Sequence, residues 1–223
     1  MKLDRIKLKE EIIKLINNSY TGKIEDMGFI SFYSSNSDME KQFRFRLQFD
    51  DMLTYEGYLV SLKKIEYYFF NLISHELKKY YDKEMSLSIG KFYKTDYDFC
   101  QEIETEYHLQ EFLEEFLKCY NFYETEIFPK LTDINFLAEY VGSVPFENAL
   151  EIVVGGTYPV TFFKKLAILK WGNHYRYEEY KKGLARFIEE DLLDPKYQQE
   201  APLYKQGFEK LIYHLENEPN PFL

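Results

Sequence analysis

The stretch Lys41–Asp50, KQFRFRLQFD, alternates aromatic and polar side chains with a period of two residues. Successive side chains of a β-strand point to opposite faces of a sheet, so this pattern predicts a strand. Its buried face should carry Phe43, Phe45, Leu47 and Phe49. Its other face should carry Gln42, Arg44, Arg46 and Gln48. Arg44 and Arg46 most simply discourage edge aggregation or pair with glutamates, and recognition of an anion or partner is the alternative.

Other segments of the chain predict an α+β fold. Alternation over 27–33, 85–89 and 99–104 adds further strands. Ser34–Asp38 suits a hairpin loop between 27–33 and the strand over 42–49. Spacings of three and four residues predict helices over 3–17, from Tyr58 to about residue 80, and over 109–120. A helical hairpin is expected over 162–171 and 177–188, with a stop at Gly172–Asn173, and a last helix opens at Pro202. We therefore expect a small antiparallel sheet of about four strands flanked by helices, with a mainly helical C-terminal half.

The organisation of the chain predicts a single domain over 1–223. The chain has 223 residues, 45% of them apolar, which is enough to bury a sizeable core. Neither a Gly/Ser-rich linker nor an internal repeat divides it. Within the domain, 1–104 should form a mixed sheet and helix part and 105–223 a helical part. The segment 132–155 is less regular than the rest.

Charge and composition exclude several classes of function. The net charge of −10 argues against general nucleic-acid or anionic-membrane binding and is compatible with a basic protein partner. Apolar runs are only a few residues long, and the N-terminus leads into a charged segment, so a cytoplasmic protein without membrane contact is expected. Cys100 and Cys119 are too few for a disulfide framework and are expected to be buried thiols.

Motifs for catalysis, cofactors and metals are not found in the sequence. His75, His108, His174 and His214 lack a second ligand at metal-binding spacing, and the acidic residues beside His108 match a helix N-terminus. Nucleophile signatures such as Gly-x-Ser-x-Gly are missing too. The loop Gly155–Pro159 could hold a phosphate at a helix start but matches neither phosphate-binding fingerprint, so a simple loop is favoured. We therefore expect no catalytic, cofactor-binding or metal-binding residues.

The distribution of charge is the most informative functional feature. Eight glutamates and one lysine lie between Gln101 and Glu126, whereas seven basic residues and two glutamates lie between Lys164 and Arg186. The acidic segment is either a solvated face or a docking surface for a cationic partner. The basic hairpin over 164–186 could enter DNA as a helix-turn-helix, although Glu178 and Glu179 oppose this. The candidate interaction residues are Arg44, Arg46, Glu111, Glu114 and Glu115.

The order of these elements resembles known families. The helical segment 8–15, the strands at 27–32 and 87–92, and the late hairpin FKKLAILK and YEEYKKGL carry this resemblance. It points to uncharacterised bacterial families of cytoplasmic proteins, some of them grouped with immunity proteins of polymorphic toxin systems. The resemblance implies a small cytoplasmic protein that binds another protein, and it assigns no functional residue.

Three functional hypotheses follow. The first is a non-enzymatic, immunity-like interaction module with an acidic, aromatic surface. The second is a hydrolase whose polar residues converge only in the folded chain. The third is a DNA-binding module that uses the hairpin over 164–186. A deep pocket lined by titratable groups would favour the enzyme, a flat acidic patch the interaction module, and an exposed basic second helix the DNA-binding protein.

Overall fold

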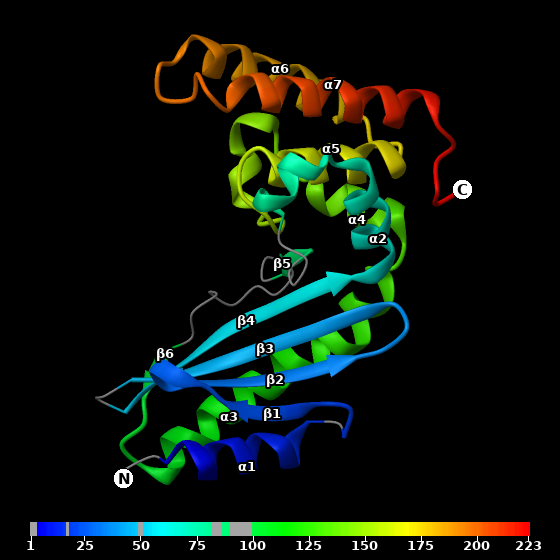
Figure 1. Cartoon of the computed structure of the whole chain (residues 1–223). Helices are drawn as coiled ribbons and strands as arrows, with labels where there is room; N and C mark the ends of the chain where they lie inside the picture. Colours follow the sequence, from blue (N-terminus) through cyan, green and yellow to red (C-terminus); the bar gives the residue numbers. More distant parts are fainter. Residues whose placement is uncertain (1–3, 17, 49–50, 82–85, 90–99) are drawn as a thin grey trace. The chain divides into compact units, whose positions relative to one another are not determined.

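The α+β class and the helical C-terminal half predicted from the sequence are confirmed in a computed structural model (Figure 1). It describes residues 4–16, 18–48, 51–81, 86–89 and 100–223. Phe49, Met85 and Phe99, which were assigned to predicted strands, lie outside the described residues, as do Leu3 and Asn17 at the ends of the first predicted helix.

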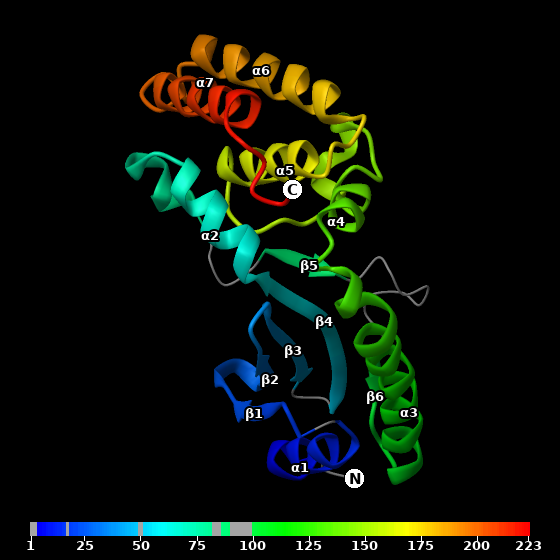
Figure 2. The same ribbon diagram turned by 90° about the vertical axis from the view of Figure 1, so that its right-hand side faces the viewer.

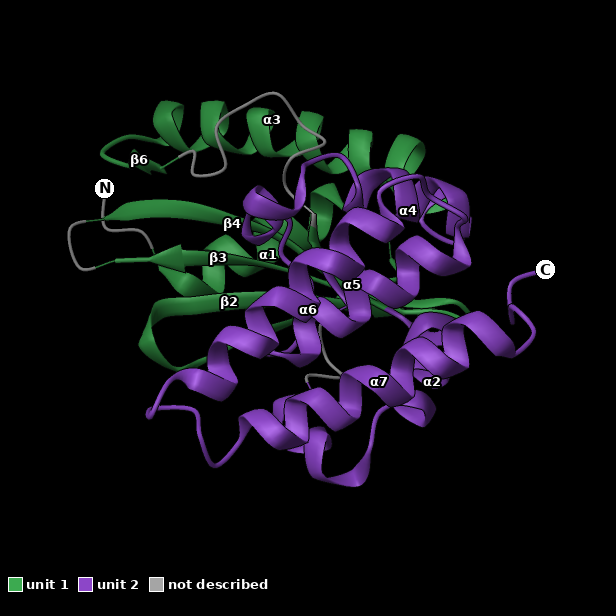
Figure 3. Cartoon of the chain, turned by 90° about the horizontal axis from the view of Figure 1, so that it is seen from above, with its two compact units in different colours: residues 1–61, 88–129 green, residues 62–87, 130–223 purple. Residues whose placement is uncertain are grey.

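The chain clusters into two compact units (Figure 3). Unit 1 comprises 1–61 and 88–129, and unit 2 comprises 62–87 and 130–223. The single domain expected from the sequence, divided at residue 104, stays a prediction. The units are divided elsewhere, because 62–87 cluster with the C-terminal helices.

The sheet has six strands among the described residues, slightly more than the four expected. They are β1 (Thr21–Ile24), β2 (Phe29–Ser35), β3 (Met39–Leu47), β4 (Met52–Leu62), β5 (Leu87–Ile89) and β6 (Cys100–Glu102). The order is β1-β2-β3-β4-β5, and β6 pairs with β4. β2 and β3 form the expected antiparallel hairpin, which places Ile30 opposite Phe45 and Phe32 opposite Phe43.

β4 corrects one prediction. The helix expected from Tyr58 begins only at Lys63, because the residues before it extend β4 to Leu62. The segment Tyr55–Leu62 is rich in aromatic and aliphatic residues that suit a sheet, and tertiary pairing overrides a short helical spacing. The helix is also shorter than expected. α2 (Lys63–Leu72) ends where Ile73 becomes extended, and a separate 3-10 helix, η2 (His75–Tyr80), follows.

The core of unit 1 is an aromatic layer between the sheet and two helices, α1 (Arg5–Leu15) and α3 (Glu106–Phe122). Phe32 stacks on Phe43 with ring centroids 4.9 Å apart, and Phe45 meets Phe116 of α3 at the same centroid distance. Figure 2 shows α3 running along this face of the sheet. The buried row of the KQFRFRLQFD strand is thus confirmed for Phe43 and Phe45, whereas Leu47 is only half-buried.

Short helical turns complete unit 1. A 3-10 turn, η1 (Asp26–Gly28), precedes β2. After α3 the chain continues through a π-helical turn, η3 (Tyr123–Ile127), and a 3-10 turn, η4 (Phe128–Lys130). Pro129, which was expected to close or kink this helix, lies in that final turn.

Unit 2 is helical and centres on α5 (Val160–Trp171), in which ten of the twelve residues are buried. α6 (Tyr177–Leu193) and α7 (Ala201–Asn217) lie side by side across it (Figures 1 and 3). The predicted hairpin is confirmed: α5 ends at Trp171, and Asn173 has the left-handed φ of 49° that often follows a helix. The irregular segment 132–155 contains α4 (Ile134–Val141) and a 3-10 helix, η5 (Phe146–Glu151).

None of the helices in the described ranges is both long and apolar enough to cross a bilayer.

Candidate functional site

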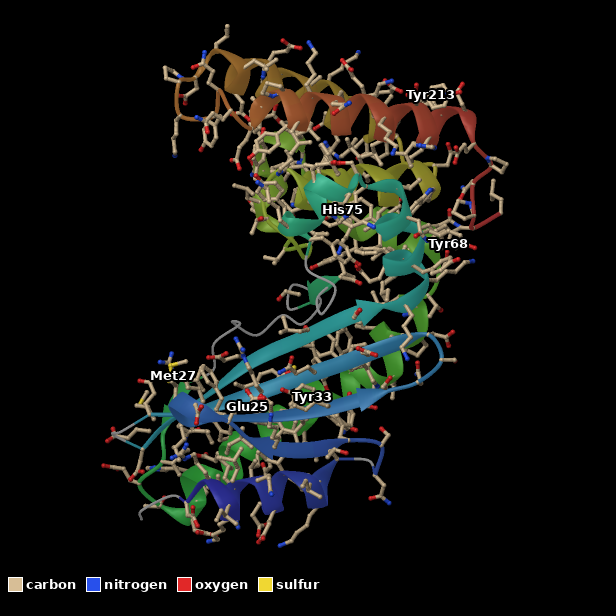
Figure 4. The ribbon with its side chains drawn as sticks, viewed as in Figure 1. Glu25, Met27, Tyr33, Tyr68, His75 and Tyr213 are labelled. Carbon is tan, nitrogen blue, oxygen red and sulfur yellow. The ribbon has the colours of Figure 1, made fainter. Side chains whose placement is uncertain are left out.

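The two strand arginines lie on the outer face of the sheet, as their alternation predicts. The Arg44 Nε atom donates to a Glu56 carboxylate oxygen at 2.6 Å, and both guanidinium groups lie over the Phe29 ring, at 4.9 Å for Arg44 and 5.4 Å for Arg46. Nearby, the Tyr33 hydroxyl donates to Glu25, and Figure 4 labels both residues on this face. The polar face therefore forms its own network of contacts, which supports a structural role for the arginines.

The acidic residues of α3 form a second surface. Glu111 and Glu114 are exposed and share a helical face with Tyr107, of which 65% is exposed. A hydrogen bond with Glu111 raises the pKa of Tyr107. Glu115 is half-buried and pairs with Lys118, whose Nζ atom lies 3.1 Å from its carboxylate. We call Tyr107, Glu111 and Glu114 the acidic face of α3. Because α3 covers the inner face of the sheet, the arginines and this face lie on opposite sides of the sheet.

The residues around His108 form a helix start. Thr105 is the N-cap of α3 and its side chain accepts from the His108 backbone N–H. The His108 Nδ1 atom accepts from the Glu104 backbone N–H at 3.3 Å. In the part of the chain that the structure describes, no group of three or more His, Cys, Asp or Glu side chains could hold a metal ion.

Unit 1 contains a buried ion pair that the sequence analysis missed. The Lys41 Nζ atom lies 2.8 Å from both carboxylate oxygens of Glu124, and the Tyr20 hydroxyl donates to the same carboxylate at 2.5 Å. Lys41 is 8% exposed and also lies 4.5 Å from the centre of the Phe128 ring. The signal was present, because Lys41 continues the row of Phe43 and Phe45 at a spacing of two.

Two consecutive lysines of α5 are buried in unit 2, but only one has a carboxylate partner among the described residues. Lys164 Nζ lies 3.0 Å from both oxygens of Glu66, which also accepts from the Ser86 and Tyr81 hydroxyls. Lys165 Nζ instead donates to the Ala149 carbonyl at 2.6 Å. Burial lowers the pKa of Lys165 to about 8.

These contacts reduce the free positive charge of the 164–186 hairpin. Lys164 and Lys165 are buried, and three more of its seven basic residues pair with carboxylates: Arg176 with Glu179, Lys181 with Glu216, and Arg186 with Glu190. The preceding loop is likewise occupied by the chain itself. The backbone N–H groups of Gly155 and Thr157 donate to the carbonyls of Ser86 and Tyr80.

The two cysteines differ. Cys119 is 3% exposed on the inner side of α3, and burial raises the pKa of its thiol to about 12. Cys100 is exposed on β6, where the sequence led us to expect a buried thiol, and its sulfur accepts from the Thr54 hydroxyl. Cys100 lies opposite Thr54 of β4, on the solvent side of the β4–β6 pair.

A pocket of 910 Å³ lies in unit 2. Its walls come from α2, α4, α5, α7 and the C-terminal segment. They combine aromatic, amide and charged side chains, among them Tyr68, Lys170, Trp171, His214 and Glu218. The titratable groups include a histidine held by a carboxylate, since His214 Nδ1 lies 2.5 Å from a Glu218 oxygen.

A scan of protein-family models, a search of curated proteins and a search of solved structures each found no match to this chain.

Proposed function

We propose that this chain is a non-enzymatic, immunity-like interaction module that binds a cationic protein through the acidic face of α3. The proposal depends on one observation: Glu111 and Glu114 are both exposed, and neither forms an ion pair in the described parts of the chain. They lie beside the exposed ring of Tyr107.

The physical support comes from the charge and from the tyrosine. A chain with a net charge of −10 attracts a basic protein at long range, and complementary charges speed association and select the partner. Tyr107 adds a rigid amphipathic ring, the kind of side chain that is enriched where protein surfaces bind one another. α3 is held firmly in place, because its opposite face packs on the aromatic core.

The test is capture of a partner by the purified protein from the source cell, followed by binding measurements with that partner in purified form. The double variant Glu111→Lys with Glu114→Lys should weaken its affinity by about tenfold or more, since each reversal places like charges at the contact. The matched control reverses Glu178 and Glu209, two exposed glutamates on α6 and α7, and changes the net charge equally.

A basic partner whose affinity falls with salt and depends on the α3 pair alone would support the proposal. Equal weakening by both double variants, or a partner bound through neither pair, would refute it.

The alternative functions have less support. The DNA-binding hypothesis depends on basic residues of which five are buried or paired, as described above. The hydrolase hypothesis is favoured by one observation, the pocket of unit 2 with its His214–Glu218 pair. Turnover of a panel of ester and phosphoester substrates that is lost in His214→Gln would promote this hypothesis over the first.

A further inference from the structure

The pocket of unit 2 is built from elements that are distant in the sequence. Tyr68, Asn71 and Leu72 come from α2 and Asn135 from α4, whereas α5 contributes Lys170 and Trp171 at its C-terminal end. Residues 214–216 of α7 and the segment after it complete the walls. Figure 4 shows Tyr68 close to this C-terminal segment. A volume of 910 Å³ lies within the range of pockets for small organic molecules, about 300–1,000 Å³.

The acidic groups in the pocket are already compensated by the protein. Glu216 accepts from Lys181 Nζ at 2.5 Å and from the Tyr177 hydroxyl at 3.2 Å. Glu218 is held by His214. Neither carboxylate therefore needs a cationic ligand.

Lys170 is a cation in the pocket wall that none of these carboxylate contacts involves. Its Nζ atom lies 4.8 Å from the centre of the Tyr177 ring, and it exerts only a longer-range attraction on Glu216. Within the described residues it forms no ion pair. Because it is half-buried at the pocket wall, a ligand anion placed there would meet a cation with reduced competition from water.

The asparagines of the pocket supply hydrogen bonds without charge. The amide of Asn220 is occupied, since it donates to the Trp171 carbonyl at 2.7 Å and accepts from the Phe222 backbone N–H. Asn71 donates to the Tyr67 carbonyl and keeps an acceptor oxygen. The side-chain amides of Asn135 and Asn173 form no hydrogen bond in the described part of the structure, and both residues are exposed.

Aromatic and aliphatic side chains form the remaining wall. Trp171 packs on Phe222 with ring centroids 5.2 Å apart, and Tyr68 contacts the same phenylalanine at 5.8 Å. These contacts fix the rings that border the pocket, together with Leu72 and Leu215. Fixed aromatic walls favour flat, apolar portions of a ligand.

We propose that this pocket binds a small organic anion with a flat ring. The carboxylate or phosphate of the ligand pairs with Lys170, its ring packs beside Trp171 and Tyr68, and the amides of Asn71, Asn135 and Asn173 bind its polar groups. This inference concerns unit 2 and does not depend on the acidic face of α3 in unit 1. Either proposal can therefore fail while the other stands.

The experiment uses two matched pairs of probes in titration calorimetry with the full chain. Indole-3-acetate is compared with its uncharged amide, and adenosine monophosphate with adenosine. At least one anion should bind about tenfold more tightly than its uncharged counterpart, a difference of about 1.4 kcal/mol. The pair that shows the difference tells whether the anionic group is a carboxylate or a phosphate.

Variants then locate the binding. Lys170→Met should remove the preference for the anion, whereas Lys182→Met, which changes an exposed lysine on α6 outside the pocket, should keep it. Should Lys170→Met fail to fold, Asn71→Ala with Asn135→Ala provides a second test and should weaken the same anion several-fold. The inference is overturned if neither anion binds at millimolar concentration. It is also overturned if charged and uncharged probes bind equally, or if the Lys170 and Lys182 variants behave alike.

Discussion

Lys164 and Lys165 are neighbours on α5 and both are almost fully buried, but only the substitution of Lys164 by methionine should destabilise the fold at neutral pH. Lys164 has a carboxylate partner in Glu66, whereas Lys165 has no carboxylate partner among the described residues. Its Nζ atom donates to the Ala149 carbonyl and lies 5.1 Å from the centre of the Phe162 ring. Replacing each by methionine keeps most of the side-chain volume and removes the amine. The pair therefore separates the effect of a buried ion pair from that of a buried single charge.

The magnitude for Lys165 follows from its pKa. A fall from the ordinary value of 10.5 to about 8 means that keeping this lysine charged costs the folded state about 3 kcal/mol. Lys165→Met removes this cost but leaves the Ala149 carbonyl without its donor, a loss of about 1–3 kcal/mol. At about pH 7 the variant should therefore range from equal stability to about 2 kcal/mol more stable than the parent.

The pH dependence has a definite sign. Between pH 8 and 10.5 the folded state has released the Lys165 proton while the unfolded chain still holds it, so the stability of the parent rises with pH in this window. The variant lacks this rise. The stability of the variant relative to the parent should therefore fall by about 3 kcal/mol as the pH increases through this window. Above the window the variant should be less stable than the parent.

Lys164→Met is the control. It leaves the Glu66 carboxylate buried without its cation and should cost about 3–5 kcal/mol at neutral pH. Urea unfolding of the parent and both variants across this pH range measures the differences directly. Other titrating groups cancel between the parent and Lys165→Met, because that substitution removes no carboxylate partner. Equal losses for both variants, or a Lys165→Met difference that does not change with pH, would refute the reasoning.

Two further predictions concern unit 1. Phe45→Ala should cost about 3–5 kcal/mol of unfolding free energy, because Phe45 is fully buried against Phe116. Arg46→Ala, on the exposed face, should change this free energy by no more than about 0.5–1 kcal/mol. Chemical denaturation measures both, and similar losses would contradict the assignment of the two faces. In the folded protein, iodoacetamide should modify Cys100 and spare Cys119, whose thiol is buried and has a raised pKa, and peptide mass spectrometry would show the error if Cys119 reacted equally fast.

Much of the fold could be predicted because it rests on local patterns. Alternation by two placed Phe43 and Phe45 on the buried face of β3 before any partner was known. The Gly172–Asn173 stop marked the end of α5, because an asparagine there can adopt the left-handed conformation that closes a helix. In these places the chain has one favourable local arrangement, and the tertiary structure keeps it.

The start of α2 and the candidate sites depended on the tertiary structure. Residues 58–62 suit a helix or a strand, and strand pairing decides between them. The pocket collects side chains from α2 to the C-terminal segment, and their convergence has no local signal.

The buried lysines show the physical reason most clearly. A lysine is tolerated in a core only when its charge or its hydrogen bonds are satisfied there. Lys41 and Lys164 meet carboxylates 83 and 98 residues away in the sequence. By itself the sequence determined the periodic faces and the excess of negative charge. The faces follow from the spacing of nearby residues, and the net charge follows from counting charged residues. Only the folded chain decided which charges are buried in pairs and which stay exposed, because packing brings together residues that are distant in the sequence.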